Sequence, residues 1–82
     1  MSIVSYEGRS NMFVYRDIKF RVQTILDPSK SPIRYNVYAK FSDDTSETRI
    51  ASKVGDWATE LDAIDDAKVQ AKLHIDEKLN QA

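Results

Sequence analysis

The residue types that carry most enzyme chemistry are scarce in this chain of 82 residues. It has one histidine, His74, and no cysteine, so it offers no thiolate nucleophile or thiolate metal ligand. A metal site at His74 would need carboxylates beside it, but Asp76 and Glu77 do not share its helical face. The serines have no histidine and acid arranged with them, and two glycines cannot form a phosphate-binding loop. The sequence therefore predicts a protein that is not an enzyme, with no catalytic residue, metal or cofactor.

Three carboxylates, Asp62, Asp65 and Asp66, crowd one short segment. They could imitate a site for a divalent cation, but the ligand spacing and the glycine of a calcium-binding loop are missing. Thr59, three residues before Asp62, is typical of a helix N-cap, and acidic side chains near a helix N-terminus interact favourably with the helix dipole. We interpret the three carboxylates as the acidic start of a helix.

The stretch "IRYNVYAKF", residues 33–41, carries a different kind of chemistry because it alternates. Successive side chains of a strand point to opposite faces of the sheet. The odd positions are apolar or aromatic and suit a core. The even positions form a second face that is basic and carries an aromatic ring: Arg34, Asn36, Tyr38 and Lys40.

Residues 18–23 and 48–54 alternate in the same way, so three strands are expected to share one uncovered face with six cations and no carboxylate. Clustered cations attract anionic partners, and a tyrosine among them could stack on a base. This face predicts weak, salt-sensitive binding of nucleic acid or of an acidic partner. The alternative is a solvated surface, since lysine and arginine are common on exposed sheet faces and discourage aggregation at edges. The candidate partner-binding residues are Lys19, Arg21, Arg34, Tyr38, Lys40, Arg49 and Lys53.

The spacing of the apolar residues changes after Gly55. Apolar residues then recur at helical spacing, and neither glycine nor proline interrupts residues 56–82, so we expect a helix over about residues 60–79. Alanines on or beside the apolar stripe let this helix lie close to a sheet. Val69 and Leu73 lie off the stripe, at an interval of four residues, and are candidates for self-association as a homodimer.

Strands followed by one helix predict an α+β fold, in which a three- or four-stranded antiparallel meander carries a C-terminal helix on one face. We expect a loosely ordered arm over residues 1–11, with a short strand as an alternative for residues 3–6, and a single β-β-β-α domain over residues 12–82. Residues 12–15 suit a short strand that turns at Arg16–Asp17. The absence of cysteine and of a long apolar run points to the cytoplasm.

Two short motifs carry family resemblances. "YRDIKFRV" and "AIDDAKVQAKLHIDEKL" resemble small bacterial domains of unknown function, in which a few strands precede one C-terminal helix; the likeness covers about residues 15–79 and implies a fold without an activity. "AKVQAKLHI" is similar to the final helix of double-stranded-RNA-binding domains. That family has a lysine-rich helix start, whereas this chain has acidic residues there, and it has a first helix that residues 1–14 do not predict. We therefore expect a small non-enzymatic binding or structural domain.

Overall fold

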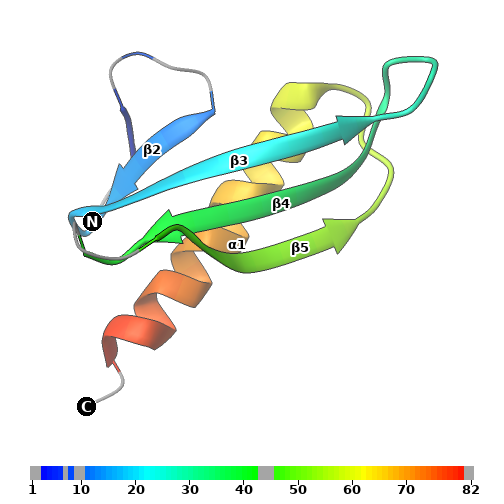
Figure 1. The fold of residues 1–82 in the computed structure, drawn as a ribbon. Helices are drawn as coiled ribbons and strands as arrows, with labels where there is room; N and C mark the ends of the chain where they lie inside the picture. Colours follow the sequence, from blue (N-terminus) through cyan, green and yellow to red (C-terminus); the bar gives the residue numbers. More distant parts are fainter. Residues whose placement is uncertain (1–2, 7, 9–10, 43–45, 81–82) are drawn as a thin grey trace.

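The computed structural model describes residues 3–6, 8, 11–42 and 46–80. They form one antiparallel sheet whose strands follow the order of the chain, with one helix behind it (Figure 1). The elements are β1 (Val4–Ser5), β2 (Met12–Tyr15), β3 (Ile18–Leu26), β4 (Pro32–Lys40), β5 (Thr48–Val54) and α1 (Glu60–Asn80). The predicted α+β class with a C-terminal helix is confirmed. The sheet has five strands instead of three or four, because β1 and β2 both pair into it.

The first hairpin turns at Arg16 and Asp17, as the sequence indicated. Tyr15 lies opposite Ile18, and the two residues between them have positive φ angles of 51° and 65°. This geometry is that of a type I′ turn, whose backbone twist matches the twist of the flanking strands. The hydroxyl of Tyr15 (2.8 Å) and Nη1 of Arg16 (2.9 Å) both donate to Oδ1 of Asp76, so this hairpin is tied to α1.

The core lies between α1 and one face of β2, β3 and β4. Phe20 pairs with Ala39 and Val22 with Val37, and all four side chains are buried. Their immediate neighbours along the strands therefore point to the opposite face of the sheet. That face, which we call the open face, has no helix or strand over it in the described part of the chain (Figure 1).

Helix α1 begins where its capping residues predict. Oγ1 of Thr59 accepts a hydrogen bond of 3.2 Å from the backbone N–H of Asp62, which satisfies one of the free amides at the helix N-terminus. Ala63, Ala67 and Ala71 are fully buried against the sheet, so the helix axis can approach it closely. Among the described residues no helix is long and apolar enough to cross a membrane.

A bulge in β5 corrects one sequence prediction. Val37 pairs with Ala51 and the next residue, Tyr38, pairs with Arg49, so Ile50 is an extra residue in β5. The alternation therefore reverses at this point. Arg49 lies on the open face as expected. Lys53 does not, because it lies opposite Tyr35 on the face that α1 covers.

The corner between β5 and α1 is built around Trp57. Its ring packs against that of Tyr35 with 5.2 Å between centroids, and its Nε1 donates to Oδ2 of Asp66 at 3.1 Å. A Cβ atom on Gly55 would come within 2.7 Å of the Trp57 ring. Gly55 is therefore required here by the close approach of the indole.

Candidate functional site

Five of the predicted cations share the open face. Lys19 and Arg21 come from β3, Arg34 and Lys40 from β4, and Arg49 from β5, and each is placed there by the antiparallel register. The side chains of Lys19, Arg34, Lys40 and Arg49 are exposed, and that of Arg21 is partly exposed.

Four of these cations are close neighbours, which we call the basic cluster: Lys19, Arg21, Lys40 and Arg49. Lys19 and Lys40 are direct cross-strand partners, and in the next row of the same face Arg21 and Arg49 flank Tyr38 on either side. Cβ atoms of direct partners lie about 5 Å apart, and successive rows on one face lie about 7 Å apart. The cluster thus concentrates positive charge over three adjacent strands.

Arg34 stands apart from the basic cluster. It lies opposite Ile25 on one side and Val54 on the other, near the end of the sheet where the chain turns between β3 and β4. Two rows, or about 13 Å, separate it from the row of Tyr38. The surface around it is more apolar, since Val54 is 66% exposed and Ile25 is 38% exposed.

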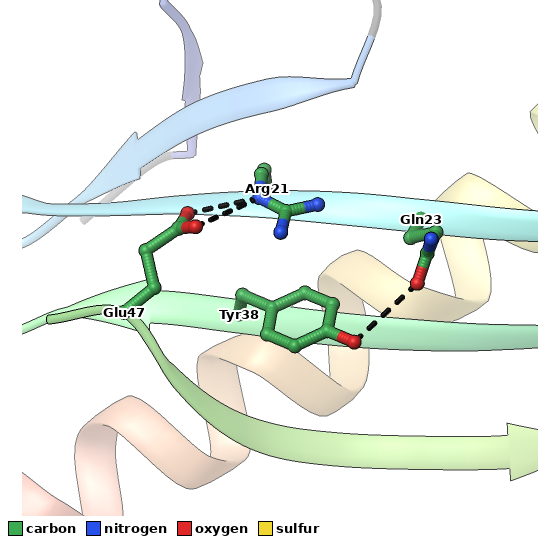
Figure 2. Close-up of polar contacts among 4 residues, drawn as sticks. All are labelled: Arg21, Gln23, Tyr38 and Glu47. Carbon is green, nitrogen blue, oxygen red and sulfur yellow. Dashed lines mark hydrogen bonds and ion pairs between the residues drawn. The ribbon is translucent and has the colours of Figure 1, made fainter.

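Arg21 is held by two contacts, as Figure 2 shows. Its Nε donates to both carboxylate oxygens of Glu47, at 3.1 and 2.9 Å, and its Cζ lies 4.3 Å from the centroid of the Tyr38 ring. Glu47 precedes β5 and reaches across the open face. The expectation that this face holds no carboxylate is therefore wrong. Sequence reasoning missed Glu47 because this residue lies in a turn segment, which lacks the alternation that assigns a side chain to one face of a sheet.

Beside Arg21, two amide side chains and a hydroxyl meet. Oε1 of Gln23 accepts from Nδ2 of Asn36 at 3.2 Å and from the hydroxyl of Tyr38 at 3.4 Å. Asn36 is only 7% exposed, and no described group donates to its Oδ1. A buried carbonyl oxygen without a donor costs stability. The sequence predicted the face of Asn36 but not its burial.

Lys53 forms an ion pair on the covered face of the sheet and does not lie on the open face as predicted. Its Nζ forms an ion pair of 3.0 Å with Oδ2 of Asp66, the same oxygen that accepts from Trp57. Asp66 also accepts from the hydroxyl of Tyr35 at 3.5 Å. Burial, together with the nearby charge of Asp66, raises the pKa of Tyr35 to about 12.

The other shifted pKa values also lie further from neutral pH than the ordinary values of their groups. Burial and the hydrogen bond to Asp76 raise the pKa of Tyr15. The hydrogen bonds from Tyr15 and Arg16 hold the pKa of Asp76 below its usual range, and the hydrogen bond from Ser29 does the same for Asp27. These shifts bring none of the four groups closer to neutral pH, where a general acid or base is most effective.

The remaining candidates lie on α1. Val69 and Leu73 are 56% and 58% exposed. His74 is exposed beside a depression of about 340 Å³, which Phe41, Ile50 and Glu77 also line. In the described ranges no three side chains of histidine, cysteine, aspartate or glutamate gather as metal ligands would.

Comparison of the chain with protein-family models, with curated proteins and with solved structures finds no significant match. The two resemblances drawn from the sequence therefore stay predictions.

Proposed function

We propose that this chain is a non-enzymatic binding domain of the cytoplasm that holds an acidic protein surface against the open face of its sheet. The supporting observation is the cross-strand pairing of Lys19 with Lys40, next to the row in which Arg21 and Arg49 flank Tyr38. Like charges directly opposite each other in a sheet are destabilising. The same arrangement raises the local concentration of anionic groups.

The contacts of Arg21 favour carboxylates over nucleic acid as the bound groups. Arg21 already binds a carboxylate, that of Glu47, through both oxygens. The ring of Tyr38 lies under the Arg21 guanidinium, so it is less available to stack on a base. Sheets that bind single-stranded RNA commonly stack two or three bases on aromatic side chains. Single-stranded nucleic acid is therefore the second candidate partner for this face.

Self-association through Val69 and Leu73 is a second candidate function. Both side chains are more than half exposed on the outer surface of α1, and a small domain gains buried apolar area by pairing.

An amide NMR titration tests the binding proposal. The isotopically labelled protein is titrated with polyglutamate and with a single-stranded oligonucleotide, at low and at physiological salt. We expect polyglutamate to shift the amides around Lys19, Arg21, Lys40 and Arg49, with an effect that weakens as salt screens the charges. Oligonucleotide binding alone would move the assignment to nucleic acid. The absence of amide shift changes with both ligands at low salt would contradict the proposal.

A pair of charge-matched variants shows whether binding depends on the face. Lys40→Gln removes a cation from the basic cluster, whereas Lys72→Gln removes one exposed cation from α1, on the other side of the sheet. We expect Lys40→Gln to weaken polyglutamate binding and Lys72→Gln to leave it nearly unchanged. Equal weakening by both variants would mean that only the net charge matters.

A further inference from the structure

The outer surface of α1 carries carboxylates near its N-terminal end and apolar side chains further along. Lys72 is also exposed there, and Nζ of Lys68 lies 3.8 Å from Oδ1 of Asp65. Asp62, Asp65, Val69 and Leu73 follow one another at intervals of three or four residues, so they lie on one face of the helix. All four are exposed. The buried helix residues Ala63, Ala67 and Ala71 occupy the opposite side, against the sheet. We call Asp62, Asp65, Val69 and Leu73 the outer helix face.

These two surfaces cannot meet within one molecule. Helix α1 lies behind the sheet when the open face is viewed from the front, so the open face and the outer helix face point in opposite directions (Figure 1). A surface with positive charge and a surface with negative charge and apolar groups are thus carried back to back. Between two copies, however, the open face of one molecule can receive the outer helix face of the next.

We propose that the acidic partner of the open face is the outer helix face of a second copy, so that the protein associates head to tail. This inference rests on the binding function proposed above and names its partner. The carboxylates of Asp62 and Asp65 would lie over the basic cluster. The lengths also agree, because α1 has 21 residues, or about 30 Å, and β3 and β4 have nine residues each, also about 30 Å.

The apolar groups support the same pairing. Val69 and Leu73 leave more than half of their surface in solvent, and the open face leaves Ile25 38% and Val54 66% exposed, on either side of Arg34. Contact between such groups removes apolar area from water while the charges orient the two copies.

A twofold pairing of two α1 helices would leave the charges of the open face without a partner. An interface that is the same patch on both subunits brings each patch against itself. With parallel helices, Asp62 and Asp65 of one copy would approach the same carboxylates of the other. With antiparallel helices they would lie over the apolar end of the patch. In both arrangements the basic cluster would stay unused. A head-to-tail contact instead joins unlike patches and leaves one of each free on the assembly, so chains grow as the protein concentration rises.

Two variants, each lacking one surface, test this inference by sedimentation velocity of the full-length protein. The sheet variant is Lys19→Gln/Lys40→Gln and the helix variant is Asp62→Asn/Asp65→Asn, and circular dichroism verifies that both are folded. We expect the wild type to associate with rising concentration at low salt and to dissociate at about 0.5 M salt, where the Debye length is about 4 Å. Each variant alone should associate about tenfold more weakly. An equimolar mixture should form a heterodimer and nothing larger, because one complementary pair of surfaces remains.

The outcomes separate this inference from the function on which it rests. A wild type that stays monomeric at all concentrations and salts would overturn head-to-tail association, while polyglutamate binding decides the proposed function independently. Association of the sheet variant as strong as that of the wild type would also overturn it and would indicate the twofold contact through Val69 and Leu73. A mixture of the two variants that shows no heterodimer would overturn it as well.

Discussion

At the scale of single residues, Asp76 connects the first hairpin to the helix. One of its oxygens accepts from both Tyr15 and Arg16, which come from β2 and the turn after it. These hydrogen bonds favour the ionised carboxylate and lower its pKa. The fold is therefore stabilised by ionised Asp76, and this stabilisation depends on pH.

We predict that Asp76→Asn lowers the free energy of unfolding at neutral pH and that its effect shrinks in acid. Because the pKa is lowered in the folded state, the contribution of Asp76 is complete above its ordinary value of 3.8 and is lost as the pH falls through the lowered value. Urea unfolding of wild type and variant between neutral pH and about pH 2 measures the difference. The control is Asp62→Asn, an exposed aspartate, for which we expect a smaller effect. A constant difference between wild type and Asp76→Asn across this range would refute the prediction.

At the same scale, the sequence predicted which basic residues share a face of the sheet but not which groups they contact. The alternation in residues 18–23 and 33–41 placed Lys19, Arg21 and Lys40 correctly on one face. The carboxylate of Glu47 on Arg21 was not predictable, because it depends on how a turn between two strands folds back over the sheet. The unpaired oxygen of Asn36 depends likewise on the packing of its neighbours.

At the scale of elements, the turn after β2 carries backbone strain. Arg16 and Asp17 both have positive φ angles, a region that costs most residues other than glycine about 1 kcal/mol or more. The turn type is set by the two-residue connection between paired strands, and the sequence has neither asparagine nor glycine there.

We predict that Asp17→Gly raises the free energy of unfolding by up to about 1 kcal/mol, because glycine adopts the left-handed conformation without the clash of a Cβ atom. The greater flexibility of glycine in the unfolded chain offsets part of this gain. Asp17→Ala is the matched control, since it removes the same carboxylate and keeps a Cβ atom; we expect it to be destabilising. Thermal or urea unfolding compares the two. Equal stabilities of both variants would mean that the backbone strain is not the deciding factor.

The packing of α1 against the sheet leads to a second prediction at the scale of elements. Ala71 is fully buried between α1 and the sheet, where a larger side chain has no space. We predict that Ala71→Leu destabilises the protein by about 1–3 kcal/mol, because the helix must move outward or the side chain must leave its preferred rotamer. Ala58→Leu, at an exposed position just before α1, should change stability little. Equilibrium unfolding in urea measures both, and a tolerated Ala71→Leu would show that the helix can shift without cost.

Elements were more predictable than their irregularities. The helix, its cap and the two long strands follow from periodicity and capping residues, which are local properties. The bulge at Ile50 is different, because it arises from the pairing of β4 with β5, and it moves Lys53 from the open face to the covered one. A shift of one residue reverses every later side chain of a strand, so the predicted face depended on a register that alternation alone does not determine.

At the scale of the whole molecule, the charges divide the protein more strongly than its formal net charge of −1 suggests. Residues 16–54 hold eight basic and five acidic residues, and residues 55–82 hold three basic and seven acidic residues. The fold places much of the first set on one side of the sheet and α1 on the other. This separation costs stability within each face, and it is what makes a contact between unlike faces of two copies favourable.

One substitution can separate the stability cost of placing Lys19 opposite Lys40 from the binding function of this pair. We predict that Lys40→Glu raises the free energy of unfolding by about 0.2–1 kcal/mol, because it replaces a like-charge pair with Lys19 by an opposite-charge pair, and that it weakens both polyglutamate binding and self-association. The gain in stability should shrink at high salt. Lys30→Glu is the control: it makes the same change of charge in the exposed turn between β3 and β4, with no cation opposite it in the sheet. If Lys30→Glu reproduces both effects, the basic cluster has no role beyond net charge. If Lys40→Glu stabilises the protein and leaves binding intact, the open face is a solvated surface and the partner must bind elsewhere.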